Sequence, residues 1–434
     1  MKNKQIVALV AVIGFAFTAC PTDDTPEETG ELQFELINNG TAYRVDGRYS
    51  YRSVNDGQTI TVYVGGEVII PAYYNDLPVT SIGYFQECTR LTGVIIPATI
   101  TSINWGAFFS CTGLTEITIP AGVTAIGANA FSRCTRLTNI IVADGNPHYA
   151  SENGILYNKD KTTIVAYPSV SGDVTILEGV TGIGESAFSA CSGLTSITIP
   201  ASVTAIGHKA FAGSVYILDF LDSPMNLQTV TFAAGSQLTA IGDYAFSDLT
   251  SLTSITIPAS VTEIGEGAFY TPYSTSTGYN NNLASVTFEA GSQLTTISSS
   301  MFFNCNSLTS INIPAGVTSI GGWAFFNCNS LTSINIPAGV TSIGGRAFFN
   351  CNSLTGITIP AGVTSIGVEA FSGCTKLLSV NIPAGVTSIG ERAFAGFNTT
   401  QLITIRGKAN QAAADAAWGI GWREDCNAII NYSE

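Results

Sequence analysis

One short pattern recurs along most of this 434-residue chain and restricts its fold more than any other feature. An isoleucine stands in the context V-T-x-I-G, or a close variant, again and again. Its positions are Ile82, Ile103, Ile126, Ile183, Ile206, Ile241, Ile264, Ile297, Ile320, Ile343, Ile366 and Ile389. Seven of the eleven steps between these positions are 23 residues long. Self-similarity at a fixed period is typical of repeat architectures, so we expect a stack of about twelve similar turns.

A single repeat predicts two short strands. Apolar and polar residues alternate over 331–336, and Pro337 ends that first strand. A second short piece, 340–343, places its apolar side chains on the inner side, and a brief helical or irregular segment with Phe348 follows. One repeat cannot bury this apolar surface alone, whereas parallel stacking at about 4.8 Å per strand buries it as a continuous column. The sequence therefore predicts an elongated solenoid with a parallel β-sheet.

The repeat also resembles a known family. Its L-x-x-I-x-I start and its I-P-x-x-V-x-x-I-G-x-x-A-F-x-x-C continuation resemble the BspA-like subclass of leucine-rich repeats over about residues 60–405. The long repeat matches too, with N-P-x-Y at 146–149, G-x-L-Y-N-K-D-K-T at 154–162 and Y-P at 167–168. One departure is Gly339, where ordinary leucine-rich repeats carry asparagine. The resemblance implies a leucine-rich-repeat solenoid in a bacterial surface lipoprotein that adheres to host-matrix or bacterial-cell proteins.

Both ends of the array have sequences suited to covering it. Residues 32–68 alternate in hydrophobicity around two hairpin-turn signals, at 38–40 and 55–57, and predict a small β cap before the repeats at 69–405. Residues 406–434 predict a C-terminal cap whose alanine-rich segment, 410–418, is helical and whose tryptophans cover the last turn. Within the long repeat, two apolar runs around 158–161 predict a hairpin.

The first 31 residues predict export. Lys2 and Lys4 precede an apolar run at 6–17, which is typical of a signal peptide over residues 1–19. The following Cys20 resembles the lipidated cysteine of a bacterial lipobox, and residues 20–31 form an acidic, proline-containing tether. We expect an outer-membrane or cell-surface lipoprotein, attached to the membrane through the lipid alone. The alternative is ordinary cleavage nearby, which leaves a periplasmic or secreted protein.

Composition argues against several functional classes. Only 11% of the residues are charged, and the formal net charge of −14 disfavours nucleic acid, which requires clustered Lys and Arg. The chain has two histidines, His148 and His208, in different repeats and without a recurring carboxylate or nucleophile partner. We therefore predict no catalytic residues, no cofactor and no metal site.

Eight of the ten cysteines occupy one position of the repeat: Cys88, Cys111, Cys134, Cys191, Cys305, Cys328, Cys351 and Cys374. Neighbouring turns hold Cα atoms close enough for disulfides, but stacked side chains point the same way, which disfavours the required Cβ geometry. Leu249 and Phe397 occupy the same position in other repeats, as at a packing site. We expect buried thiols; Cys426 lies outside the array.

Two features are candidates for recognition. The outward face of the sheet carries Ser310, Asn312, Ser333, Asn335, Ser379 and Asn381, a ladder of short donors and acceptors. Two insertions, 212–226 and 270–282, emerge from the array, and the second carries Tyr270, Tyr273 and Tyr279 among small polar residues that suit protein contact. The alternatives are that outward residues must be small and polar anyway, and that the insertions are neutral expansions.

These observations predict an exported scaffold that binds extracellular or cell-surface proteins, including matrix proteins. A spacer protein of the envelope without a specific ligand is the alternative, followed by a glycan-binding protein. Fold alone does not decide among them.

Overall fold

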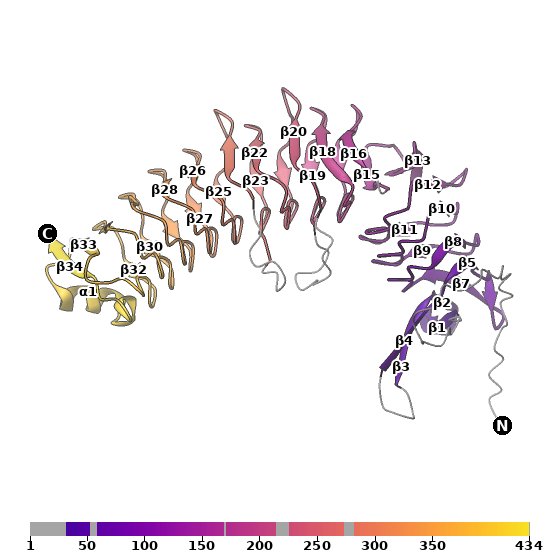
Figure 1. Cartoon of the computed structure of the whole chain (residues 1–434), viewed down its shortest axis with the longest axis horizontal. Helices are drawn as coiled ribbons and strands as arrows, with labels where there is room; N and C mark the ends of the chain where they lie inside the picture. Colours follow the sequence, from indigo (N-terminus) through magenta and orange to yellow (C-terminus); the bar gives the residue numbers. More distant parts are fainter. Residues whose placement is uncertain (1–31, 53–58, 169–170, 214–224, 273–281, 434) are drawn as a thin grey trace, which may run out of the picture. The chain divides into compact units, whose positions relative to one another are not determined.

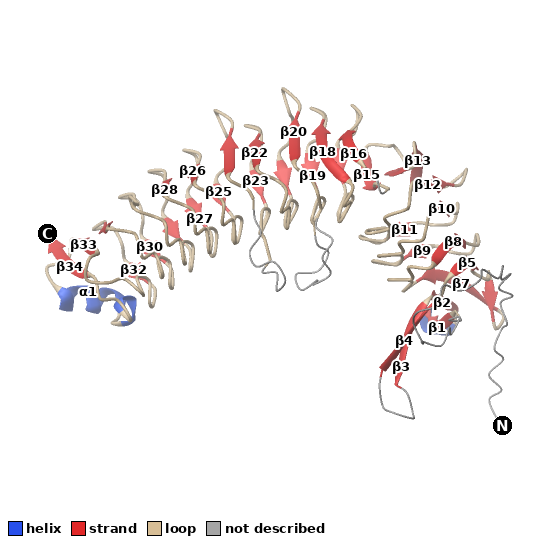
Figure 2. Ribbon diagram, in the orientation of Figure 1, coloured by secondary structure: helices blue, strands red, loops and turns tan. Residues whose placement is uncertain are grey.

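The structure is a computed structural model that describes residues 32–52, 59–168, 171–213, 225–272 and 282–433. The chain divides into two compact units, residues 1–170 and residues 171–434 (Figures 1 and 2). The predicted signal peptide, Cys20 and the tether at 20–31 lie outside the described residues.

Unit 1 begins with antiparallel hairpins. Strand β1 (Gln33–Ile37) pairs with β2 (Ala42–Asp46) around the short 3-10 helix η1 (Asn38–Gly40), and β3 (Arg48–Arg52) pairs with β4 (Thr59–Tyr63). The small β cap and its first turn are therefore confirmed, whereas the second predicted turn, 55–57, lies outside the described residues. Strand β2 also pairs in parallel with a strand of the first repeat, so the cap already belongs to the stack.

The remaining strands of unit 1 form the first turns of the array and a small meander. Two parallel pairs lie on one side: β5 (Gly66–Ile69) with β8 (Leu91–Ile95), and β10 (Glu116–Ile119) with β12 (Asn139–Val142). Strand β2 continues into β7 (Leu77–Ile82), β9 (Ser102–Ile103) and β11 (Ala125–Ile126), and β6 (Tyr73–Tyr74) pairs with β7. The long repeat forms β13 (Tyr149–Glu152), β14 (Ile155–Asn158) and β15 (Thr163–Ala166), all antiparallel, which confirms the predicted hairpin.

Unit 2 contains two parallel columns of strands (Figure 1). The longer strands are β16 (Gly172–Thr175), β18 (Leu194–Ile199), β20 (Thr229–Phe232), β22 (Ser254–Ile257), β24 (Ser285–Phe288), β26 (Ser310–Asn312), β28 (Ser333–Asn335), β31 (Ser379–Ile382), β33 (Leu402–Arg406) and β34 (Ile429–Ser433). The two-residue strands are β17 (Gly182–Ile183), β19 (Ala205–Ile206), β21 (Ala240–Ile241), β23 (Glu263–Ile264), β25 (Thr296–Ile297), β27 (Ser319–Ile320), β29 (Ser342–Ile343), β30 (Ser365–Ile366) and β32 (Ser388–Ile389).

The inward positions are those that the repeat predicts. In the turn that contains β28 and β29, Ile334, Val340, Ile343 and Phe348 are buried. The rings corresponding to Phe348 in neighbouring turns stack along the unit, with centroids 5.3 Å apart between Phe325 and Phe348. Because every turn supplies one fully buried phenylalanine, the core is a continuous aromatic column rather than a globular cluster.

The third side of each turn is irregular rather than helical. Residues 346 and 350 have φ values of 54° and 56°, in the left-handed region. As a result, the amide of Phe348 donates to Ala370 O in the next turn at 2.8 Å, whereas the amide of Phe349 donates to Arg346 O in its own turn at 3.2 Å. This alternation satisfies the backbone without a helix.

Glycine after the repeating isoleucine allows neighbouring turns to approach closely. A Cβ atom placed on Gly344 would lie 2.4 Å from the backbone nitrogen of Gly322 in the preceding turn. That separation is impossible for a real side chain, so glycine allows the close approach at this turn, although Asn104 and Ser298 occupy the same position in two other turns.

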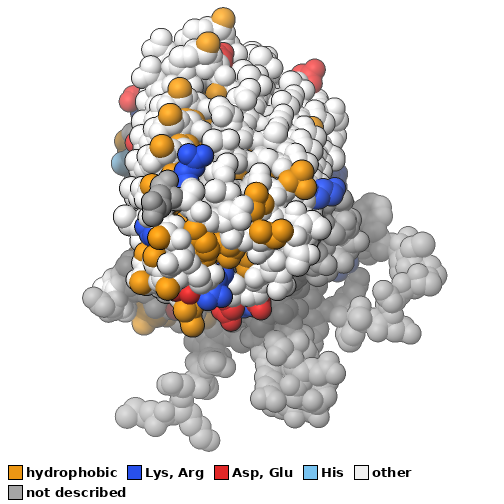
Figure 3. All heavy atoms as spheres, turned by 90° about the vertical axis from the view of Figure 1, so that its left-hand side faces the viewer, with side chains coloured by type: hydrophobic (Ala, Val, Ile, Leu, Met, Phe, Trp, Pro, Cys, Tyr) orange, Lys and Arg blue, Asp and Glu red, His pale blue; other side chains and the backbone are white. Residues whose placement is uncertain are grey.

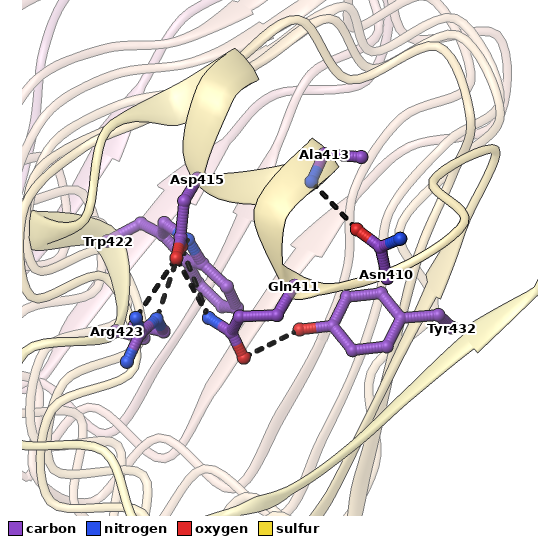
Figure 4. A network of polar contacts seen from close by, with 7 residues as sticks. All are labelled: Asn410, Gln411, Ala413, Asp415, Trp422, Arg423 and Tyr432. Carbon is purple, nitrogen blue, oxygen red and sulfur yellow. Dashed lines mark hydrogen bonds and ion pairs between the residues drawn. The ribbon is translucent and has the colours of Figure 1, made fainter.

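The C-terminal cap is helical, as predicted. Helix α1 (Gln411–Trp418) begins at Asn410, whose side chain accepts a hydrogen bond from the amide of Ala413, and η2 (Gly421–Arg423) follows. Trp422 is fully buried and meets the last ring of the column, Phe394, edge to face. Asp415 holds this cap together, because it accepts hydrogen bonds from Arg423, Gln411 and Trp422 (Figure 4).

The phenylalanine column generates a prediction on stability. Replacement of Phe348 by Ala leaves a cavity between two stacked rings and should cost about 3–5 kcal/mol, whereas Phe349→Ala, at a half-exposed ring one residue later, should cost clearly less. Thermal unfolding followed by circular dichroism compares the two variants. Equal losses of stability would contradict a core built on this column.

The cap generates a prediction on pH. Hydrogen bonds from Arg423, Gln411 and Trp422 lower the pKa of Asp415, so the ionised form stabilises the fold at neutral pH. This contribution should be present above the pKa of an unfolded aspartate, about 3.9, and be lost as the pH falls through the lower folded pKa. Asp415→Asn should therefore lower the unfolding midpoint at pH 7 and approach the wild type near pH 2. The exposed Glu424→Gln is the control, and a pH-independent difference would refute the role of the charge.

Candidate functional site

The outward face of the longer strands presents the six polar residues that the sequence singles out. In register, Ser310 faces Ser333 and Asn312 faces Asn335, and strand β31 carries Ser379 and Asn381. All six side chains are exposed, and none makes a hydrogen bond within the described part of the chain. Their hydroxyl and amide groups are therefore available to a partner.

Other hydroxyls on the surface are already used by the fold. Thr332 Oγ1 donates to Thr309 O at 3.1 Å, and Thr341 Oγ1 donates to Thr318 O at 3.2 Å, in each case one turn back. Such bonds tie successive turns together and satisfy the threonines internally. The serines and asparagines of the outward face thus differ from these threonines, although the sequence shows all of them as a polar repeat.

The outward face is nearly uncharged from β26 to β31. Its six candidate residues carry no ionisable group, and the C-terminal end of unit 2 shows hydrophobic side chains with scattered charges between them (Figure 3). At the start of the unit the same face is different, because the carboxylate of Asp173 accepts a hydrogen bond from Ser196 at 2.6 Å. The hydroxyls of Ser196 and Thr195 lower the pKa of Asp173.

Tyr270 lies in the repeat itself. Its carbonyl accepts a hydrogen bond from the amide of Asp248, and its ring stacks on Phe303 with centroids 4.8 Å apart. This packing within the repeat is therefore a structural explanation for Tyr270, and it competes with the predicted role of Tyr270 as a contact residue in the insertion. Tyr273 and Tyr279 lie outside the described residues, as does Cys20.

Tyr270 belongs to a second aromatic column that the sequence analysis missed. Centroids are 4.6 Å apart between Phe303 and Phe326 and 4.9 Å apart between Phe326 and Phe349. These rings are half-exposed, unlike the buried column beside them. The signal was present in the sequence, since an aromatic residue follows the buried phenylalanine in four consecutive repeats.

A buried asparagine ladder lies next to this second column. Asn327 Nδ2 donates to Asn304 Oδ1 at 3.0 Å, and Asn350 Nδ2 donates to Asn327 Oδ1 at 3.1 Å. Asn304 starts the ladder by donating to Thr271 O at 2.8 Å. Ladders of this kind fix the register of stacked strands, so these asparagines are structural.

The cysteines at the repeat position are buried thiols, as predicted. Most of them donate to a phenylalanine carbonyl one turn back; Cys111 Sγ, for example, donates to Phe85 O at 3.0 Å, whereas Cys88 Sγ donates to Gly47 O at 3.4 Å. Burial raises the pKa of Cys191 to about 12, and burial also raises the pKa of Cys374 to about 12. Thiols of this kind are poor nucleophiles and poor metal ligands at neutral pH.

Ionisable side chains do not gather into a catalytic or metal-binding arrangement within the described ranges. No group of three or more His, Cys, Asp or Glu residues with metal-binding geometry occurs there. The ring of His208 meets Tyr244 with centroids 6.1 Å apart, and His148 is exposed in a turn. Among the described helices, none has the length and apolar character of a membrane span.

The fold and this polar face define a leucine-rich-repeat scaffold. The sequence also identifies the family within this class. The chain belongs to the BspA-type leucine-rich repeat family, because the family model described as "BspA type Leucine rich repeat region (6 copies)" matches residues 80–217, 170–270, 218–290 and 271–401. The predicted family and fold class are thereby confirmed. No curated protein matches the sequence significantly.

Among solved structures, the chain is similar to bacterial leucine-rich repeat proteins. A leucine-rich repeat protein from Bacteroides ovatus is 25% identical, covers 94% of this chain and 99% of its own length, and superposes with a TM-score of 0.51. A leucine-rich cell surface protein from Faecalibacterium prausnitzii is also 25% identical, with 94% and 95% coverage and a TM-score of 0.44. A leucine-rich repeat protein from Eubacterium ventriosum is 21% identical, covers 79% of this chain and 92% of its own, and has a TM-score of 0.45.

The thiols generate a prediction on reactivity. The sequence has ten cysteines, so a Cys20→Ser variant retains nine. At pH 8 a water-soluble disulfide reagent should modify at most the half-buried Cys426 of the native protein, because burial keeps the others protonated and inaccessible. In denaturant without reductant all nine should react. A lower total would reveal disulfides.

Proposed function

We propose that this protein is an exported, lipid-anchored scaffold that binds extracellular or cell-surface proteins through the outward face of its longer strands. The observation that carries the proposal is the set of six exposed, neutral hydrogen-bonding side chains at Ser310, Asn312, Ser333, Asn335, Ser379 and Asn381, which the fold itself does not use.

The rigidity of the face favours binding. Successive strands are held by backbone hydrogen bonds and by the core column, so these polar groups keep a fixed spacing and lose little conformational entropy when a partner binds. Short side chains also lose less rotamer freedom than Lys, Arg or Glu would. A regular row of donors and acceptors suits an extended polypeptide whose own polar groups repeat along its length.

Export and anchoring are part of the proposal. The apolar run at 6–17 and the lipobox-like Cys20 support delivery to the outer membrane or the cell surface, with the acidic segment at 20–31 as a tether. Family membership supports an adhesive role toward matrix proteins or other bacterial cells.

The test is a binding comparison between two variants of the chain from residue 31 onward. In the face variant, Asn312, Asn335 and Asn381 are all replaced by Ala. In the control variant, the exposed Asn352 and Thr375 of the irregular side are likewise replaced by Ala. Immobilised matrix proteins and whole bacterial cells are the probes, and binding is measured by surface plasmon resonance and cell adhesion. Three lost hydrogen-bonding groups, each worth about 0.5–1.5 kcal/mol, should weaken saturable binding at least about tenfold.

The control should bind like the wild type, and unfolding midpoints should be equal for all three proteins. Saturable binding that survives in the face variant would move the contact elsewhere, and a Tyr270, Tyr273 and Tyr279→Ser variant would test the second insertion. If the folded wild type binds none of the probes, the spacer role is favoured instead.

A further inference from the structure

A shallow hollow opens on the irregular side of unit 2. Its volume is about 450 Å³, and it is lined by Glu266, Ser299, Ser300, Gly322 and Trp323. It is distinct from the outward face of the longer strands, and it combines one large aromatic ring with a carboxylate and two hydroxyls.

Trp323 is the only difference between two otherwise identical turns. The 23 residues from Leu308 to Ser330 and those from Leu331 to Ser353 differ at a single position, which is Trp323 in the first turn and Arg346 in the second. Both residues have left-handed backbone, with φ values of 62° and 54°. Since the repeat does not require tryptophan at this position, its presence needs an explanation other than the fold.

The indole ring has one occupied side and one open side. The ring stacks with Phe303 and Phe326, at interplanar angles of 18° and 21° and with centroids 5.8 and 5.3 Å away, and Trp323 remains 40% exposed. Arg346, from the following turn, places its guanidinium carbon 5.1 Å from the ring centroid. Ser300, at the same repeat position one turn earlier, lines the hollow together with Trp323.

Polar groups face this open side. Glu266 is exposed, and its carboxylate makes no hydrogen bond within the described part of the chain. Its backbone amide donates to Asp243 Oδ1 at 2.7 Å, which fixes the turn that carries it. Burial, and next the carboxylate of Glu266, raise the pKa of Tyr244.

We propose that this hollow binds one pyranose ring of a neutral glycan. The C–H face of the sugar packs on the open face of Trp323, its hydroxyls donate to the Glu266 carboxylate, and the hydroxyls of Ser299 and Ser300 complete the hydrogen bonds. This site is independent of the protein-binding face, because the two lie on different sides of the turns.

The charges favour a neutral ligand over a cationic one. Arg346 already occupies one face of the indole as a cation and is paired with Glu369. A second cation on the opposite face of the same ring would be repelled by the first and would gain less from the ring quadrupole. An uncharged polyol has no such cost.

A second hollow suggests more than one sugar. Its volume is about 600 Å³, and its lining includes His208, Asp243, Gly265 and Ser298. Gly265 and Ser298 directly precede Glu266 and Ser299, so the two hollows follow each other on the same turns. An unbranched oligosaccharide would cross several turns in this way.

The test uses the chain from residue 31 onward and a panel of neutral tetrasaccharides of glucose, galactose, mannose and N-acetylglucosamine. Saturation-transfer NMR identifies a binder, and calorimetric titration gives its dissociation constant, expected at roughly 0.1–1 mM for a shallow site. Trp323→Ser, a residue that the preceding turn carries at this position, should weaken binding about tenfold or more. Trp105→Ser, in unit 1 and with 42% exposure, is the matched control and should bind like the wild type.

A second variant keeps the test independent of any change in folding. Glu266→Gln retains the shape of the side chain and should weaken binding about three- to tenfold. Sugar binding should not depend on salt between about 50 and 500 mM, a range over which the Debye length falls about threefold. The face variant at Asn312, Asn335 and Asn381 should bind the sugar normally, so failure here is distinct from failure of the protein-binding proposal. Three outcomes would each overturn the proposal. The first is no saturable sugar binding, and the second is an equal loss of affinity in the Trp323 and Trp105 variants. The third is salt-sensitive binding of a lysine-rich peptide in place of sugar.

Discussion

Backbone hydrogen bonds between successive turns are the interaction on which the rest of the structure depends. In one turn, Thr341 donates through its amide to Thr318 O at 2.9 Å, Gly344 to Ile320 O at 2.8 Å, and Phe348 to Ala370 O at 2.8 Å. These bonds form only if neighbouring turns are close and in register. Gly344 provides the closeness, and the phenylalanine column and the asparagine ladder provide the register.

Stacking in register brings like residues together at every position, and this selects which side chains a repeat can use. Phenylalanine stacks on phenylalanine, asparagine donates to asparagine, and threonine donates to the carbonyl one turn back. Charged side chains would repel their own copies at the same spacing. The low charged fraction of 11% follows, and one column brings opposite charges together in the ion pair between Arg346 and Glu369.

The sequence allowed the average turn to be predicted, because every inward position is repeated. Buried Ile334, Val340, Ile343 and Phe348, and the hairpin of β14 and β15, all follow from hydrophobic alternation and turn residues. The irregular side was less predictable. Its amides donate alternately to the next turn and within their own turn, so its conformation cannot be inferred from one repeat alone.

Features of the candidate sites depend on differences between turns, which a consensus repeat hides. The free polar groups at Asn312 and Asn335 cannot be separated by sequence from bonded threonines beside them, since the difference lies in which way each side chain points. The hollow beside Trp323 likewise depends on the small Ser300 one turn earlier. Tyr270 shows the reverse case, because its place beside an insertion concealed its packing against Phe303.

The near identity of the turns that start at Leu308 and Leu331 has a consequence for how such a protein changes. Removing or duplicating 23 residues anywhere within that region restores the same junction, leaves the β cap and helix α1 intact, and keeps every neighbour contact of the same kind. The length of the repeat array can therefore change by whole turns, and such a change does not alter the contacts that stabilise its two ends. Recombination between the two near-copies would lengthen or shorten it without designing a new interface.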